Sequence, residues 1–132
     1  MDSSKSIENY FDALGAIFDC LKKHEIETIF MTPNMMNTYV SSRTSTAFVE
    51  TAKLTAEMQN SGIMDDYIEC ARKTCREKKI LVCDCYKKWK AMHDAGVETT
   101  SLLSNHINHP TRELHGLFAS SLFNMLMWED IK

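Results

Sequence analysis

Apolar residues recur at helical spacing over most of the chain. From Ser6 to His24 they fall three or four positions apart, which predicts an amphipathic helix with Ser6 as its N-cap. The same spacing predicts four further helices, over residues 46–59, 64–78, 86–93 and 111–129. The pattern therefore predicts about five helices.

Two short runs interrupt the helical spacing and predict strands. The run over residues 26–31 has a continuous apolar core at 29–31, and residues 80–83 are apolar throughout, which is typical of parallel strands covered on both faces. Helices that alternate with such strands indicate an α/β domain. Because two parallel strands make a very narrow sheet, we expect part of a larger sheet to be missing. Residues 34–45 are polar and predict a long loop at the carboxyl end of the first strand, where ligands bind in open α/β sheets.

Composition limits the classes of function. The chain has 132 residues, 44% of them apolar, which predicts one domain over residues 1–132. A net charge of −3 with scattered lysines and arginines argues against a nucleic-acid partner, and no segment predicts a signal peptide or a membrane span. Five cysteines without a secretion signal favour a cytoplasmic protein and mostly buried thiols. Their spacing does not match a metal site, so we expect neither a metal nor a cofactor.

The segment Asn-His-Ile-Asn-His-Pro at residues 105–110 carries the candidate chemistry. Pro110 biases His109 toward extended backbone, so the loop presents this imidazole in a restricted geometry. His109 is therefore a candidate general acid or base, and the alternative is a loop histidine that caps the final helix. His106 is either a surface residue or an unusual partner of His109. Asn105 and Asn108 are expected to make local turn hydrogen bonds.

In their order along the chain, these elements resemble the C-terminal half of an SGNH (GDSL-type) hydrolase. The motifs that carry the resemblance are Ile-Phe-Met-Thr-Pro-Asn at 29–34, Ile-Leu-Val-Cys-Asp at 80–84 and Ile-Asn-His-Pro at 107–110, with His115 behind them. The resemblance covers nearly the whole chain. It implies a partial flavodoxin-like three-layer α/β/α fold and a GDSL-like lipase or acylhydrolase, an esterase that acts on acylated carbohydrates or lipids.

By this resemblance His109 corresponds to the catalytic histidine. The family's partner acid lies three residues earlier, where this chain has His106, so we expect a Ser–His dyad or a third member from elsewhere. Asn105, His106 and Asn34 are the candidate orienting or pocket residues. The family's nucleophilic serine and oxyanion-hole residues lie upstream and have no counterpart here, and the first four residues resemble the tail of an Asn-Asp block. We therefore expect a fragment that is inactive alone.

A sheet without its first half would expose unpaired backbone groups and apolar faces. We expect the chain to cover them by forming a homodimer or by associating with the missing N-terminal half. The alternative function is a non-catalytic α/β interaction module that binds a partner through the exposed strand edge. A cysteine–histidine metal protein is a third and weaker interpretation.

Overall fold

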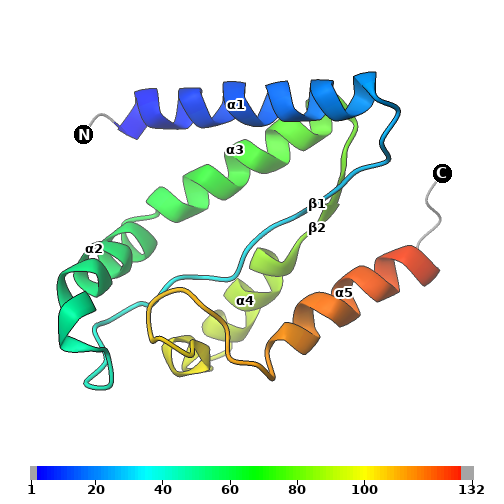
Figure 1. Ribbon diagram of the computed structural model, residues 1–132. Coiled ribbons are helices and arrows are strands. Elements are labelled where there is room, and N and C mark those ends of the chain that lie inside the picture. The colour runs from blue at the N-terminus through cyan, green and yellow to red at the C-terminus, as the bar shows by residue number, and fades with distance from the viewer. Residues whose placement is uncertain (1–2, 129–132) are drawn as a thin grey trace.

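The computed structural model describes residues 3–128 (Figure 1). These residues form five α-helices, two short strands and two short 3-10 helices. In chain order the elements are α1 (Ser3–Lys23), β1 (Ile29–Met31), η1 (Thr46–Phe48), α2 (Val49–Asn60), α3 (Ile63–Lys78), β2 (Leu81–Cys83), α4 (Cys85–Asp94), η2 (Thr99–Leu102) and α5 (His115–Trp128). The expectation of an α/β fold with about five helices and few parallel strands is confirmed.

The two strands form a parallel sheet between two layers of helices. Phe30 lies opposite Val82 in the register, and both pack against the cluster that α1 and α3 contribute. Their neighbours Ile29, Met31 and Cys83 pack instead with side chains of α5. Because successive strand residues point to opposite faces, α1 with α3 covers one face of the sheet and α5 covers the other. Figure 1 shows α1 and α3 running side by side, with α5 across the strands from them.

Local chemistry explains where several elements end. Lys79 ends α3 with a left-handed backbone (φ 57°), and its N–H donates to the Arg76 carbonyl. Gly62 takes φ 86° between α2 and α3, a conformation that glycine adopts without steric cost. Asp84 begins α4 by accepting a hydrogen bond from the backbone N–H of Lys87.

Several predicted boundaries need correction. The first helix begins at Ser3, so Ser6 is not its N-cap, and the Ser6 hydroxyl instead hydrogen-bonds the Tyr67 hydroxyl. The last helix begins at His115 rather than at Thr111, because the intervening residues form turns. Its predicted end at Glu129, like the motif residues Met1 and Asp2, lies outside the described residues.

The strands are less covered than their apolar sequences predict. All three residues of β1 are half-buried, and Leu81 at the start of β2 is 39% exposed. Helices therefore cover both faces of the sheet, as predicted, but the strands between them are only partly buried. Within residues 3–128, β1 pairs with β2 alone and carries no strand on its other side. Among the same residues, no helix is both long and apolar enough to cross a membrane.

Candidate active site

The loop that carries His109 is organised around one side chain, that of Asn105. Its Oδ1 atom accepts hydrogen bonds from the backbone N–H groups of Ile107, Asn108 and His109, each at 3.0 Å. Its amide nitrogen donates to the side-chain oxygen of Asn108 at 2.9 Å. The predicted turn hydrogen bonds are thus present, and Asn105 shapes the backbone on which His109 sits.

The base of the loop is closed by a short antiparallel contact. Leu103 and Pro110 form an isolated β-bridge, and the Ser104 N–H donates to the His109 carbonyl at 2.7 Å. The Ser104 hydroxyl donates to the same carbonyl at 3.2 Å. The backbone of His109 is therefore fixed through both its N–H and its carbonyl, while its side chain is exposed.

The loop docks on the segment that follows the carboxyl end of β1. The side-chain amide of Asn34 donates to the Asn108 carbonyl at 2.9 Å and to the Met35 carbonyl at 2.7 Å. Ile107 is 4% exposed and its carbonyl accepts from the Asn37 N–H at 2.8 Å. The structure thus brings Asn34 next to the His109 loop, where it joins two backbone segments.

His106 does not orient His109. It takes a left-handed backbone (φ 56°), which lets the chain turn between Asn105 and Ile107. Its N–H donates to the Leu103 carbonyl at 3.0 Å. No hydrogen bond joins the imidazoles of His106 and His109 in the part of the chain that the structure describes, so His109 lacks an orienting partner at this position. The alternative role for His109, capping the final helix, is also wrong, because α5 begins six residues later.

A second polar cluster lies where both strands end. The Asp84 carboxylate follows β2 and accepts from the Thr32 hydroxyl, which follows β1, at 3.0 Å. The Thr32 oxygen in turn accepts from the Tyr86 N–H at 2.9 Å, and the Arg72 guanidinium donates to both Asp84 oxygens. Burial opposes ionisation of Asp84, but the hydrogen bonds from Arg72, Lys87 and Thr32 outweigh it and hold the pKa of this carboxyl below its ordinary value.

A polar hollow of about 300 Å³ adjoins the segment after β1. Met35 lines it but is otherwise a core residue, 2% exposed. The hydroxyl of Tyr86 accepts from the Gln59 amide and donates to Asp65, each at 2.8 Å, and Lys90 pairs with the same carboxylate at 3.3 Å. These groups satisfy one another, so the hollow offers few free polar atoms to a ligand.

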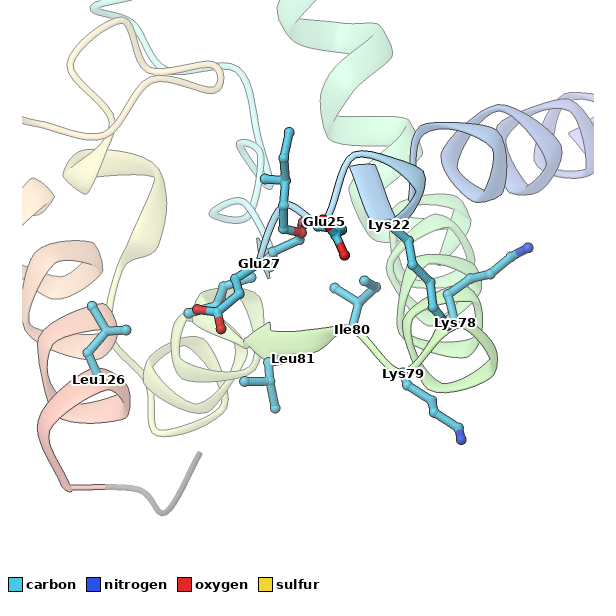
Figure 2. Close-up of a pocket in the computed structure, with 11 residues that line it drawn as sticks. Lys22, Glu25, Glu27, Lys78, Lys79, Ile80, Leu81 and Leu126 are labelled. Carbon is cyan, nitrogen blue, oxygen red and sulfur yellow. Dashed lines mark hydrogen bonds between the residues drawn. The ribbon is translucent and has the colours of Figure 1, made fainter. Parts of the chain in front are cut away.

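A larger hollow of about 590 Å³ lies at the amino ends of the strands, away from the His109 loop. Figure 2 shows Leu81 and Ile80 at the start of β2 in this hollow, with Lys78 and Lys79 beside them and Leu126 of α5 across from them. Ligands of parallel sheets bind at the carboxyl ends of the strands, so this hollow is not the expected catalytic cleft.

Comparisons with protein-family models, curated proteins and solved structures find no match to this chain. Within the described residues, no group of three histidine, cysteine, aspartate or glutamate side chains is placed to hold a metal ion. The candidate site is therefore defined by the chain's own residues.

Sequence analysis did not identify Arg72 and Thr32 as partners of Asp84. An acid directly after a predicted strand is a signal for the carboxyl edge of a sheet, and Asp84 stands at such a position. Its guanidinium partner comes from α3, twelve positions earlier, and no spacing rule connects the two residues. The site thus consists of an exposed imidazole on a braced loop and a neighbouring scaffold of satisfied polar groups.

Proposed function

We propose that this chain is the C-terminal part of an SGNH-type, GDSL-like serine ester hydrolase and supplies its catalytic histidine, His109. The observation that carries the proposal is an exposed imidazole on a loop whose backbone is fixed by Asn105 and Ser104 and docked, through Asn34, behind the carboxyl end of β1. A general base needs such a position, because the reacting group must reach it while its own backbone stays in place.

The layered arrangement supports the finer assignment of the fold. Helices on both faces of a parallel sheet are a feature that flavodoxin-like α/β/α proteins share with other doubly wound folds, and β1 and β2 would be two of the strands. The free side of β1 is suited to receive a further strand from an upstream segment. The first half of the sheet would complete the fold there.

In the proposed reaction, His109 accepts the proton of a serine hydroxyl as that oxygen attacks the ester carbonyl, and then returns the proton to the leaving alcohol. The sequence contains no Gly-Asp-Ser motif, so the serine and the oxyanion donors would come from the upstream segment. Because position 106 holds a histidine, the site would act as a Ser–His dyad or take its acid from elsewhere. The proposed substrates are acylated carbohydrates or lipids.

Cysteine chemistry supports a location in the reducing cytoplasm. All five cysteines are free, and Cys75, Cys83 and Cys85 are buried. Most of the thiols are thus buried, as expected, whereas Cys20 is exposed and Cys70 is half-buried. Free thiols of this number persist where glutathione keeps them reduced.

The test compares ester hydrolysis by the chain alone and by the chain coexpressed with the segment encoded directly upstream of it. With p-nitrophenyl acetate as the substrate, we expect background rates for the chain alone, because a base without a nucleophile leaves most of the barrier in place. The coexpressed pair should be active. Substantial turnover by the chain alone that is lost in His109→Ala would contradict the proposed division of the site.

A second candidate function is a non-catalytic interaction module. The observation that favours it is the one-sided pairing of β1, since an open strand edge can add a strand from another protein. An upstream reading frame without Gly-Asp-Ser and Gly-x-Asn-Asp motifs would support the module over the hydrolase.

A further inference from the structure

The outer face of α5 is apolar and exposed. Phe123, Leu126, Met127 and Trp128 are 56%, 51%, 58% and 77% exposed, although the opposite side of the same helix packs on the sheet through Met125. The sequence from Leu114 to Trp128 contains no lysine, arginine, aspartate or glutamate. Large apolar side chains that stand exposed together on an uncharged stretch of helix are ordinarily covered by a partner, so this face requires a cover.

The exposed side chains supply a large part of the surface that a specific dimer buries. The exposed parts of these four large side chains amount to roughly 500 Å². Two further surfaces extend this area. One consists of the small exposed residues on the same face, and the other is the edge of the hollow in Figure 2, which Leu126 and Leu81 both line. The total approaches the roughly 800 Å² per partner that is common in stable complexes, and the four side chains alone match the largest apolar patch of an ordinary monomer.

We propose that a second copy of this chain covers this face, and that the two α5 helices pack antiparallel to each other. The exposed stripe of α5 consists of Gly116, Ser120, Phe123 and Met127, which follow one another at intervals of four, three and four residues. This is the spacing of a helix–helix seam. The first two residues of the stripe, Gly116 and Ser120, have small side chains, and the last two have large ones. The stripe is therefore complementary in shape to a reversed copy of itself.

The spacing sets the register of the pair. If Gly116 of one copy faces Met127 of the other, Ser120 of the first copy faces Phe123 of the second, because both pairs have the same midpoint between Ser121 and Leu122. A two-fold axis at this midpoint generates every contact twice, as in other isologous dimers. Each large side chain then lies over a small residue, which permits the close approach of two helices.

This inference goes beyond the proposed function and does not rest on it. The proposed dimer uses neither His109 nor an upstream segment. The dimer is tested by molecular mass and the hydrolase by ester hydrolysis, so each proposal can fail without the other.

The experiment is light scattering coupled to size-exclusion chromatography on the 132-residue chain, from about 1 to about 100 µM. We expect a dimer over most of this range. Phe123→Glu places a charge in the seam and should weaken dimerisation about 30-fold or more. Phe48→Glu is the matched control, because Phe48 on η1 is also 56% exposed, and this variant should dimerise like the unaltered chain.

A second variant, Gly116→Leu, separates the seam from folding. Apart from the backbone of α5 and the two adjoining residues, no atom lies within 4 Å of a Cβ placed at Gly116, so the monomer accommodates a side chain there. The leucine would occupy the space that Met127 of the second copy takes, and dimerisation should weaken while the circular dichroism spectrum is retained. A monomeric unaltered chain at about 100 µM, equal weakening by Phe48→Glu, or a Gly116→Leu dimer of undiminished affinity would overturn the proposal.

Discussion

Arg72 and Asp84 form a two-point ion pair that ties α3 to the start of α4. The Arg72 Nε atom lies 3.0 Å from Asp84 Oδ2, and the Nη2 atom lies 3.1 Å from Oδ1. Each side chain is only 25% exposed. Because Asp84 also accepts from Thr32 and Lys87, this carboxylate joins α3, the end of β1 and the first turn of α4. It is the centre of the scaffold at the carboxyl edge of the sheet.

Removing this carboxylate is expected to destabilise the fold. Asp84→Ala loses a helix cap and leaves the partly buried Arg72 guanidinium with Glu69 alone, so we expect the free energy of unfolding to fall by about 2–3 kcal/mol. Urea denaturation at neutral pH measures this change. Asp19→Ala is the control, because Asp19 pairs with Lys78 at the surface and such pairs contribute about 0–1 kcal/mol. Equal losses in the two variants would contradict the assigned role of Asp84.

The same carboxylate predicts a pH dependence of stability. A carboxyl group whose pKa is depressed in the folded state stabilises the protein above its unfolded-state pKa, near about 4, and that contribution is lost as pH falls through the lower folded value. Asp84→Asn keeps a capping side chain but cannot ionise. The stability difference between the unaltered chain and Asp84→Asn should therefore shrink as pH falls below about 4. If the stability difference between the two proteins stayed constant between neutral and acidic pH, the Asp84 carboxyl would not have a depressed pKa in the folded state.

The side chain of Asn105 is expected to hold the His109 loop. Asn105→Ala removes the acceptor of three backbone N–H groups, so hydrogen exchange at residues 107–109 should accelerate and stability should fall by about 1–2 kcal/mol. Asn9→Ala, at an exposed position inside α1, should leave exchange of the loop amides unchanged and should not lower stability, because alanine favours a helix more than asparagine does. Unaltered protection of the loop amides in Asn105→Ala would show that other contacts fix the loop.

The five thiols should differ strongly in reactivity. Burial raises the pKa of Cys75 and of Cys85 to about 11, and both side chains are inaccessible, whereas Cys20 is exposed. At mildly alkaline pH we expect Ellman's reagent to modify Cys20 first and the two buried thiols at rates lower by about 100-fold or more. Cys20→Ser should abolish the fast phase. A fast phase that persists in this variant would mean that a second thiol is accessible.

The helices and strands were predictable because they depend on local periodicity. The Asn105 turn was predictable for the same reason, since its partners lie within four residues. The only partial burial of β1 was not, because burial of a strand depends on what packs beside it rather than on its own composition. The late start of α5 was also missed, because turn hydrogen bonds after Pro110 compete with the helix.

The contacts that define the site lie beyond the reach of local rules. Asn34 and the Asn108 carbonyl are 74 positions apart, and Thr32 and Asp84 are 52 positions apart. Sequence analysis could assign Asn34 to a loop at the end of a strand, but not to the bond that docks the His109 loop. Topology brings such residues together, and only the fold specifies which of them touch.

The most direct test of the central claim is the effect of two histidine substitutions on p-nitrophenyl acetate hydrolysis by the chain coexpressed with its upstream segment. His109→Ala should lower kcat/KM by about 100-fold or more, because it removes the proton acceptor. His115→Ala should leave the rate within about two-fold, because that imidazole is exposed at the start of α5 and its Nδ1 atom lies 3.0 Å from the Thr111 carbonyl. Full activity in His109→Ala, or equal losses in both variants, would contradict the assignment of His109 as the catalytic base.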